Sequence, residues 1–307
     1  DFADIDRDSD VDFFMADMMG QTYEAKQTQM GLQRPLPEEV GAVRNRPQES
    51  QNTLLVNRGD DTWAEVGELA GVEASGWTWS ALFLDVDLDG YEDLLLTNGH
   101  HYDAMDADAQ TRVTNTNYGR NWRRSLLDYP PHDQHNAAFR NRGDGTFEAV
   151  PAGWGIGAEA DVAHGMATGD LDRDGDQDVV VSRLNAPVGI YRNAARAARV
   201  AVRLRGEAPN TRGIGAKVTA RALGADGAEP GGVPEQTKEM VAGGQYLSDS
   251  VAEVTFAVGV SDSVAIEVAW PGGARSRVEG GVNRVYEIAA PGVPAPDEEA
   301  VASRARP

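Results

Sequence analysis

The stretch that decides the fold is DVDLDGYEDLLLTNG, residues 85–99, in which aspartates at alternate positions lead directly into a run of leucines. A near copy, DLDRDGDQDVVVSRL, begins at Asp170, and a looser one, DIDRDSDVDFFMADM, begins at Asp4. Three versions of one pattern in a chain of 307 residues indicate an internal repeat. Each copy reads as an acidic loop followed by a β-strand.

A second repeated element follows the first. NTLLVNRGDDTWAEV, from Asn52, matches NAAFRNRGDGTFEAV, from Asn136, and the third copy ends at GIYRN, residues 189–193. Each unit therefore reads as strand, acidic loop, strand, variable excursion, strand, tight Gly-Asp turn and strand. A four-stranded antiparallel unit repeated along a chain is typical of a β-propeller blade. The sequence predicts an all-β fold that begins with a partial propeller of about three such blades.

The repeat is longer than that of compact propellers. Asp4 and Asp85 lie 81 residues apart, and Asp85 and Asp170 lie 85 apart, against roughly 40 to 50 in the compact repeats. The surplus falls in two excursions, 20–51 and 100–135, and a short helix is expected within 102–127. Three blades do not close a ring, because propellers have about four to eight. Either upstream blades are missing from this chain, which we favour, or a partner covers the open edges.

The acidic loop at 85–93 has the composition of a calcium site. Its aspartates fall at positions 1, 3, 5 and 9, and Gly90 at position 6 permits the sharp turn that wraps them around one point. Calcium takes roughly six to eight oxygen ligands, and the carbonyl of Tyr91 would add to the carboxylates. The predicted ligands are Asp85, Asp87, Asp89, Asp93 and Tyr91.

The other two copies repeat this pattern with one departure. Ser9 stands in the first loop where the other loops have glycine, which predicts strain and weaker binding there. The predicted ligands of the third loop are Asp170, Asp172, Asp174 and Asp178, with Asp176 at the carbonyl position. Those of the first loop are Asp4, Asp6, Asp8 and Asp12, with Asp10 at the carbonyl position.

The acidic loops have two alternatives to a strand-loop-strand calcium site. An EF-hand requires glutamate at position 12 and flanking helices, whereas position 12 is Met15, Leu96 or Val181 and the flanks are β-rich. Solvated acidic turns that bind nothing remain the other alternative. Calcium is favoured because clustered carboxylates repel one another unless a cation neutralises them.

Composition narrows the classes of partner. The formal net charge is -21, with 49 acidic and 28 basic residues, which argues against nucleic acid and anionic membranes as partners. The absence of cysteine excludes disulfides and thiolate metal sites. No apolar run approaches the roughly 18 residues of a membrane span. Since the sequence opens inside a motif at Asp1, we expect a processed or truncated N-terminus.

The C-terminal part has a different pattern. From Ala198 onward, short alternating strands such as ARVAVRLRG and VAIEVAWPGG are separated by glycine turns, which predicts a small β-sandwich. The segment 224–236 is expected to be a polar loop. The tail, 291–307, lacks periodicity and is expected to be extended.

These motifs resemble known families. DxDxDGxxD with NRGDGTF nearby resembles the FG-GAP/VCBS repeats of integrin-α-type propellers, and GWTWSALFLDVDLDGYEDLLLTNGH resembles the cartilage acidic protein family and its bacterial relatives. The C-terminal part resembles the ASPIC/UnbV domain. The residues that carry this last resemblance are Asn210, Gly213, Gly215, Ala216, Gly244, Tyr246, Leu247, Ser248, Trp270 and Pro271. We interpret them as turn and core residues.

The resemblance implies the following domain organisation. Residues 1–195 form FG-GAP/VCBS blades, at about 1–66, 67–150 and 151–195. Residues 196–290 form the ASPIC/UnbV-like β-sandwich, and 291–307 form the tail.

We expect no enzymatic activity and no catalytic residues. No nucleophile elbow, phosphate loop or dinucleotide fingerprint lies in the required context. All histidines fall between 100 and 164, and a second metal site involving them is a minor alternative. Those residues are His100, His101, His132, His135 and His164.

Two functions remain. The favoured one is a calcium-binding extracytoplasmic protein, secreted, periplasmic or on the cell surface and bacterial in origin, that acts as an interaction module for another protein or a glycan. The alternative is a structural accessory subunit of a larger extracytoplasmic or membrane-associated assembly. The long excursion 20–51 favours the subunit, because a segment without its own core needs a surface to lie on.

Overall fold

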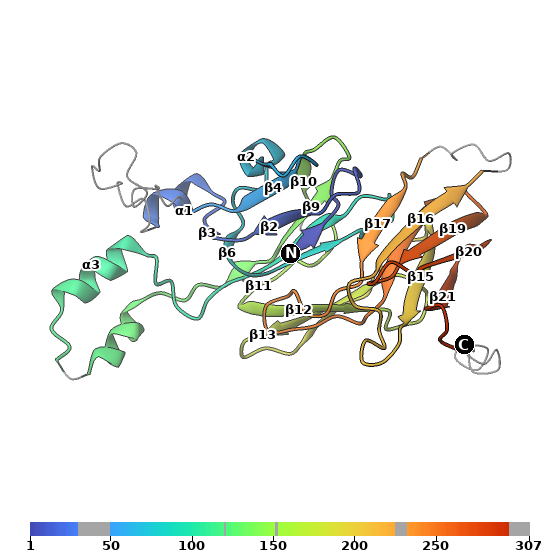
Figure 1. Cartoon of the computed structure of the whole chain (residues 1–307). Coiled ribbons are helices and arrows are strands. Elements are labelled where there is room, and N and C mark those ends of the chain that lie inside the picture. The colour runs from blue at the N-terminus through green and yellow to red at the C-terminus, as the bar shows by residue number, and fades with distance from the viewer. Residues whose placement is uncertain (30–49, 120, 151–152, 225–231, 295–307) are drawn as a thin grey trace.

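The computed structural model describes residues 1–29, 50–119, 121–150, 153–224 and 232–294, and over this part the protein is all-β (Figure 1). Three blades stack face to face, and two C-terminal sheets adjoin them. The predicted fold class is therefore confirmed. Most of the excursion 20–51, most of the predicted polar loop 224–236 and most of the tail lie outside the described residues.

Blade 1 is a four-stranded antiparallel sheet in the order β1-β2-β4-β5. The first acidic loop, loop 1 (4–12), joins its first two strands, β1 and β2. A short helix, α2 (Gly67–Ala70), follows the last strand and ends at Gly71, whose φ of 79° is left-handed. The strands are β1 (Phe2–Ala3), β2 (Asp12–Met15), β4 (Thr53–Asn57) and β5 (Trp63–Glu65).

Blade 2 repeats this order and gains an edge strand. Its sheet runs β10-β9-β7-β6-β3, and loop 2 (85–93) joins β6 to β7. The extra strand β3 belongs by sequence to the excursion after blade 1. The strands are β3 (Met18–Met19), β6 (Gly76–Leu84), β7 (Asp93–Asn98), β9 (Ala137–Asn141) and β10 (Phe147–Ala149).

Blade 3 has three strands in the described part of the chain, in the order β12-β13-β14. Loop 3 (170–178) joins its first two strands, and the third ends in GIYRN as predicted. The strands are β12 (Ala163–Gly169), β13 (Asp178–Arg183) and β14 (Gly189–Tyr191). Separately, β8 (Gln134–His135) pairs with β11 (Ala160–Asp161) and links blades 2 and 3.

Alternation along each strand builds two cores between the blades. Leu94 and Leu96 of β7 pack with Phe14 and Leu54 of blade 1. Leu95, which points to the other face of the same sheet, packs with blade 3. Blade 2 is therefore apolar on both faces, which explains why β7 reads as a continuous leucine run.

The excursions carry the other helices of the described residues. The helix α1 (Tyr23–Thr28) follows β3, and α3 (Ala107–Asn115) lies in the second excursion, within the range 102–127 predicted for a short helix. The 3₁₀ helix η1 (Trp122–Asp128) follows α3 and ends one residue beyond that range. The segment with α3 projects away from the blades on the side opposite the C-terminal sheets (Figure 1). Within the described residues, none of the helices is long and apolar enough to cross a membrane.

The C-terminal part is a β-sandwich, as predicted. One sheet runs β18-β15-β21 and the other β17-β16-β19-β20, and both bury apolar side chains in one shared core. The first sheet consists of β15 (Ala198–Arg205), β18 (Val254–Gly259) and β21 (Arg284–Ala289). The second consists of β16 (Lys217–Leu223), β17 (Gln236–Glu239), β19 (Ser263–Ala269) and β20 (Arg275–Gly281).

A loop of the sandwich, the docking loop (241–251), runs along the free edge of β12. Ser248 Oγ accepts a hydrogen bond from the backbone N–H of Met166 at 3.2 Å and donates to the carbonyl of Met166 at 2.6 Å. Ser250 Oγ accepts from the N–H of Thr168 at 3.0 Å. The sandwich is thereby bonded directly to β12, an edge strand of blade 3.

Candidate metal centres

The three acidic loops share one pattern of hydrogen bonds around their ninth residue. In loop 2, Asp93 Oδ2 accepts from the N–H of Val86 at 2.8 Å, and Asp93 Oδ1 accepts from the N–H of Asn141 at 2.9 Å. The same two bonds are made by Asp12 in loop 1 and by Asp178 in loop 3. This aspartate therefore closes each loop and ties it to the third strand of its blade.

The first aspartate organises the turn. Asp85 accepts from the N–H groups of Asp89 at 3.0 Å and Gly90 at 2.9 Å. Asp170 makes the equivalent bonds in loop 3, both at 3.1 Å, and Asp4 accepts from the N–H of Ser9 at 3.1 Å.

The turn needs positive φ at two positions of each loop. The sixth residue has φ of 96° at Gly90, 94° at Gly175 and 72° at Ser9. Ser9 therefore adopts the strained conformation that was expected from the missing glycine. The fourth residue is also left-handed in every loop, although it is Arg7, Leu88 or Arg173, and no sequence signal marked it.

In each loop, three aspartates bring their carboxylates together, and one oxygen of each lies within 4.8 Å of one oxygen of the other two. These sets are Asp4, Asp6 and Asp8 in loop 1, Asp85, Asp87 and Asp93 in loop 2, and Asp170, Asp172 and Asp178 in loop 3. The other predicted carboxylate ligands lie outside them, namely Asp12, Asp89 and Asp174.

The aspartate at the fifth position of loops 2 and 3 makes other contacts. Asp89 Oδ1 accepts from the N–H of Tyr91 at 3.0 Å, and Asp89 Oδ2 lies 3.0 Å from Arg140 Nη2. Asp174 Oδ1 accepts from the N–H of Asp176 at 3.2 Å and lies 2.9 Å from Arg199 Nη2. These side chains shape the turn and pair with arginine.

The residues at the seventh position of the loops, whose carbonyls are predicted ligands, make different contacts in the three loops. The N–H of Asp10 donates to Asp8 Oδ1 at 2.8 Å, and the Tyr91 ring lies 5.5 Å below the Arg7 guanidinium. The Asp176 carboxylate is fully buried and lies 3.4 Å from Arg199. Burial raises the pKa of Asp176 to about 7.

Arginines from the third strands flank two of the loops, and sequence reasoning missed them. Arg140 Nε lies 2.6 Å from Asp87 Oδ2, and Arg192 Nη1 lies 3.1 Å from Asp172 Oδ2. Both arginines directly precede the repeated asparagine, in FRN and YRN, and that repeat was a usable signal. Val56 occupies the equivalent position in blade 1.

The donor sets suit a hard divalent cation. Asp4 Oδ1 and Asp87 Oδ1 are buried and accept no hydrogen bond within the described residues. Burial raises the pKa of Asp93 to about 9 and that of Asp85 to about 7, although backbone N–H groups and Lys238 act in the opposite direction. A bound cation would satisfy the free oxygens and supply the missing positive charge.

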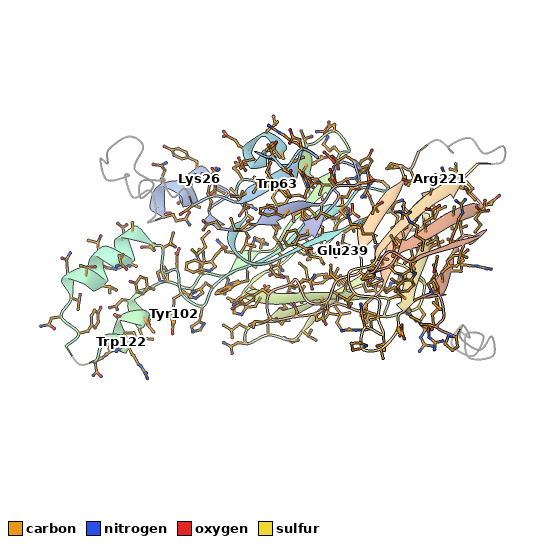
Figure 2. The ribbon with its side chains drawn as sticks, in the orientation of Figure 1. Lys26, Trp63, Tyr102, Trp122, Arg221 and Glu239 are labelled. Carbon is orange, nitrogen blue, oxygen red and sulfur yellow. The ribbon has the colours of Figure 1, made fainter. Side chains whose placement is uncertain are left out.

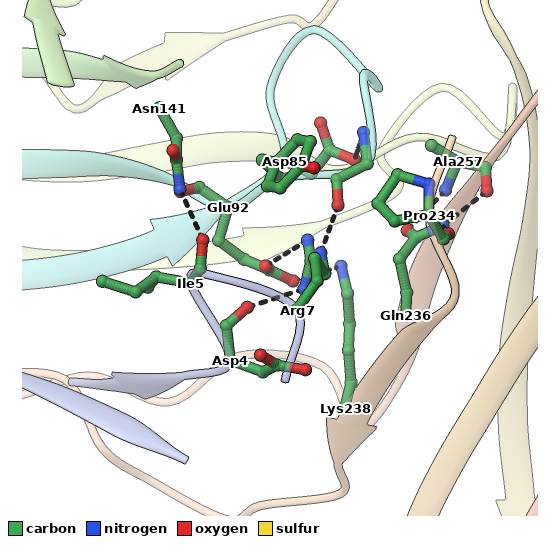
Figure 3. A network of polar contacts seen from close by, with 12 residues as sticks. Asp4, Ile5, Arg7, Asp85, Glu92, Asn141, Pro234, Gln236, Lys238 and Ala257 are labelled. Carbon is green, nitrogen blue, oxygen red and sulfur yellow. Dashed lines mark hydrogen bonds and ion pairs between the residues drawn. The ribbon is translucent and has the colours of Figure 1, made fainter. Parts of the chain in front are cut away.

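Loops 1 and 2 meet the sandwich in a buried charge network (Figure 3). Arg7 forms an ion pair with Glu92, and Lys238 Nζ of β17 lies 3.1 Å from Glu92 Oε1. The Arg7 and Glu92 side chains are only 4% and 5% exposed. The pKa of Glu92 is lowered because the two cations outweigh the effect of its burial.

Loop 3 meets the sandwich through the same position of its repeat. Gln177, the equivalent of Glu92, donates from Nε2 to Glu253 Oε1 at 3.0 Å and to Thr255 Oγ1 at 3.2 Å. Glu253 in turn forms an ion pair with Arg203. The eighth residues of loops 2 and 3 thus join the propeller to the sandwich. The repeat pattern does not predict this role, because it depends on contacts with segments far away in the sequence.

The histidines form no comparable centre. His132 Nδ1 lies 3.1 Å from Asp103 Oδ2, His135 Nδ1 contacts the carbonyl of Gly157, and His101 packs on Tyr102. His100 stacks on Trp77 with ring centroids 4.5 Å apart, and His164 packs on Trp79 at 4.6 Å. Over the described ranges, only the aspartate groups have three metal-ligating side chains in reach of one another.

Most residues that suggested an ASPIC/UnbV domain lie in turns and core. Asn210 bonds both backbone groups of Ile214 at 2.8 Å, and Trp270 and Ala216 are buried in the sandwich core. Gly213 has a φ of 65°, and a side chain there would lie against Leu204 and Trp270. Gly244, Tyr246, Leu247 and Ser248 lie instead in the docking loop.

Comparison with known proteins agrees with this organisation. Residues 206–294 match the family model described as ASPIC and UnbV, and residues 128–181 match the model described as FG-GAP-like repeat. No curated protein matches the chain. The predicted FG-GAP and ASPIC/UnbV resemblances are confirmed, and the more specific likeness to the cartilage acidic protein family stays a prediction. FG-GAP repeats are typical of extracellular proteins, and this combination indicates an interaction module of that type.

Proposed function

We propose that this chain is a non-enzymatic, calcium-binding interaction module that works outside the cytoplasm and contacts another protein or a glycan. Calcium would occupy the three acidic loops and stabilise the blades. The aspartates of the loops then serve as ligands, and carboxylates held ionised by a cation are poor general acids.

One observation carries this proposal. Three loops that are far apart in the sequence each bring three carboxylates together, so that their oxygens lie within 4.8 Å of one another. In two of these three-aspartate sets, a buried carboxylate oxygen accepts no hydrogen bond from the described residues, namely Asp4 Oδ1 and Asp87 Oδ1. Mutual repulsion of these groups is relieved by a hard cation with flexible coordination, for which calcium is suited better than magnesium.

Thermal unfolding tests the calcium sites. The chain is melted in millimolar calcium, after exhaustive chelation with EGTA, and after magnesium is added back. We expect a large fall in Tm on chelation that calcium reverses and magnesium does not, because a ligand of the folded state stabilises it by mass action. Equal Tm values in all conditions would contradict the proposal.

A matched pair of variants assigns the effect to a loop. Asp85→Asn removes a charge from the set in loop 2, whereas Asp262→Asn removes a charge from an exposed site of the sandwich. Calorimetric titration should lose one calcium site in Asp85→Asn and none in Asp262→Asn. Loss of binding in both variants would point to a general charge effect.

The accessory-subunit function keeps one supporting observation. The segment around η1 exposes Trp122 and Leu127, which are 62% and 72% accessible, on the projecting excursion (Figure 2). Exposed apolar side chains on such an arm are typical of contacts with a partner. Co-purification of a stable partner that Trp122→Ser releases would favour the subunit, and unchanged capture by this variant would count against this arm as the contact.

A further inference from the structure

Blade 3 has no fourth strand in the described part of the chain, and this leaves one edge of its sheet free. There, β14 pairs with β13 on one side. After Asn193 the chain passes through residues 194–197 into β15 of the sandwich, whereas after Asn57 and Asn141 it turns back to form a fourth strand. The free edge of β14 therefore lies in the interior of the chain, between segments that the structure describes.

The backbone of this edge matches groups that are bonded in the other two blades. The carbonyl of Ala138 in β9 accepts from the N–H of Val150 at 2.8 Å, and that of Leu54 in β4 accepts from the N–H of Val66 at 2.8 Å. Strand register makes Ile190 of β14 the counterpart of both acceptors. By this correspondence the Ile190 carbonyl points to the free edge, where no described residue bonds it. The Ile190 side chain is 64% exposed.

A cavity of about 310 Å³ lies beside this edge, between blades 2 and 3. Its apolar lining comes from both blades and from the connection between them, and includes Val86, Leu95, Trp154, Ile156, Val179 and Tyr191. Protein interiors contain few voids larger than a water molecule. A cavity of this size indicates that the described residues do not supply every element of this interface.

The corresponding space between blades 1 and 2 is filled by Phe147 of β10. Phe147 is 8% exposed and packs in one core with the residues that match the cavity lining by register and by position in the repeat. These are Ile5, Phe14, Ala70, Val72, Leu94 and Phe139. The cavity is therefore the place of an aromatic side chain from a fourth strand, which blade 2 supplies itself and blade 3, within the described residues, does not.

We propose that blade 3 accepts its fourth strand from a partner protein. The strand would run antiparallel to β14 and place an aromatic side chain in the cavity, as extended peptides do when they add a strand to an exposed sheet edge. In β10 the aromatic Phe147 is followed by Glu148, which lies opposite Arg140. Arg192 takes the place of Arg140 in blade 3, so the partner strand carries an aromatic residue followed by an acidic one.

This inference rests on the proposed function in one respect, because it names the kind of segment through which another protein binds the module. A single extended strand fits the site better than a folded surface, since β14 is three residues long and the cavity has room for one large side chain. The opposite edge of blade 3, at β12, is already covered by the docking loop through Ser248 and Ser250.

A synthetic peptide with the chain's own fourth-strand sequence, DGTFEAV (residues 144–150), tests the proposal on the full chain in millimolar calcium. Calorimetric titration should show one peptide bound per chain, with a Kd below about 1 mM. Two altered peptides separate the two contacts. Phe147→Ser removes the ring that enters the cavity, and methylation of the Val150 nitrogen removes the hydrogen bond to the Ile190 carbonyl. Each should weaken binding at least about tenfold.

A matched pair of variants locates the peptide on the chain. Arg192 directly follows β14, and alternation along the ladder turns its backbone N–H to the same side as that of Ile190. Arg192→Pro removes this N–H, and proline is tolerated at sheet edges where the N–H faces solvent. Arg192→Gln keeps the N–H and removes the charge. Peptide binding should fall at least about tenfold in Arg192→Pro and at most about threefold in Arg192→Gln.

Hydrogen exchange distinguishes a partner from the protein's own sequence. The amides of Ile190 and Arg192 should exchange rapidly in the free chain and become protected when the peptide binds. Protection before the peptide is added would show that another segment of the same protein covers the edge, and would overturn the proposal. Absence of peptide binding, or equal binding of the unaltered and Phe147→Ser peptides, overturns it as well. The altered peptides test these contacts on the unchanged chain, should Arg192→Pro fail to fold.

The two proposals fail separately. Calcium stoichiometry is measured by calorimetry on the same samples, and Arg192 lies outside every acidic loop. A chain that binds calcium but not the peptide overturns the strand inference alone. A chain that binds the peptide but no calcium overturns the proposed calcium sites alone.

Discussion

Loops 2 and 3 have the same backbone path and the same internal hydrogen bonds, yet they lie in different environments. In loop 2, Asp85 and Asp93 are buried, and the eighth residue is a charged glutamate between Arg7 and Lys238. In loop 3, Asp170 is half-buried and the eighth residue is a neutral glutamine. The repeat therefore determines the shape of the loop, and the elements packed around it determine its electrostatics.

The largest loss of stability should follow when the buried charge network at loop 2 is broken. Arg7→Met leaves the buried Glu92 with Lys238 as its remaining cation, and removal of one partner of a buried ion pair costs about 3 to 5 kcal/mol. We expect the free energy of unfolding in urea to fall by about that amount.

Lys26→Met is the matched control for this change. Its pair with Glu73 spans 3.6 Å and is about one third exposed, so its loss should cost less than about 1 kcal/mol. Equal losses of stability in Arg7→Met and Lys26→Met would show that the buried network contributes nothing beyond surface charge.

A smaller difference in stability is expected when the turn glycine of loop 2 or of loop 3 is replaced by alanine. Both have left-handed φ, but a Cβ on Gly90 would lie 2.8 Å from Val233 and 3.0 Å from Pro234, whereas one on Gly175 would lie 3.6 Å from Arg199. Gly175→Ala should cost about 1 kcal/mol through strain, and Gly90→Ala about 2 to 3 kcal/mol through strain and overlap. Equal Tm shifts would mean that the sandwich does not press on loop 2.

The pH dependence of the free energy of unfolding, measured without calcium, should also show the effect of the buried carboxyls of loop 2. Burial raises the pKa of Asp93 to about 9 and that of Asp85 to about 7, so the folded protein holds protons that the unfolded chain, with carboxyl pKa values near ~3.9, releases. The free energy of unfolding in EGTA should therefore rise as the pH falls from about 9 toward about 4.

Asp93→Asn removes the most strongly shifted carboxyl and should flatten this profile more than Asp172→Asn, at an exposed residue of loop 3, does. Excess calcium should reverse the trend, because protons compete with the cation. A profile in EGTA that is identical for both variants and the unchanged chain would contradict the difference between the loops.

The smallest effect concerns the arginines beside the loops. Arg140 contacts both Asp87 and Asp89, whereas Arg192 contacts Asp172 alone and is 66% exposed. Arg140→Gln should raise calcium affinity about twofold to threefold at loop 2, and Arg192→Gln should change loop 3 less. Calorimetric titration of the two variants measures this, and weaker calcium binding in Arg140→Gln would show that the arginine supports the site.

The sequence predicted the parts of this molecule that are encoded locally. The three acidic loops, their flanking strands and the end of blade 3 at GIYRN follow from residue periodicity and turn composition. The assignment of positions 1, 3, 5 and 9 as one ligand set stays a prediction, and Asp89 and Asp174 lie beside arginines from other segments. These contacts depend on the surroundings of each loop.

The contacts that bind the parts of the molecule to one another were not predicted. Glu92 and Lys238 lie 146 positions apart in the sequence and meet only because β17 packs against loop 2. The sequence also did not predict the bonds from Asn141 and Asn193 to the preceding blades, although both asparagines belong to the repeat. A repeated residue that is polar and lies at the end of a strand was the available signal.

The serine contacts of the docking loop have a consequence for how the protein avoids aggregation. The strand β12 is an edge strand of blade 3. Its outward backbone N–H and C=O groups could pair with a strand from another molecule, which is the first step toward fibrils. Ser248 and Ser250 occupy those groups with hydroxyls and a short length of backbone that does not itself form a strand. The sandwich thereby acts as a cap that ends the sheet and gives no template for further growth.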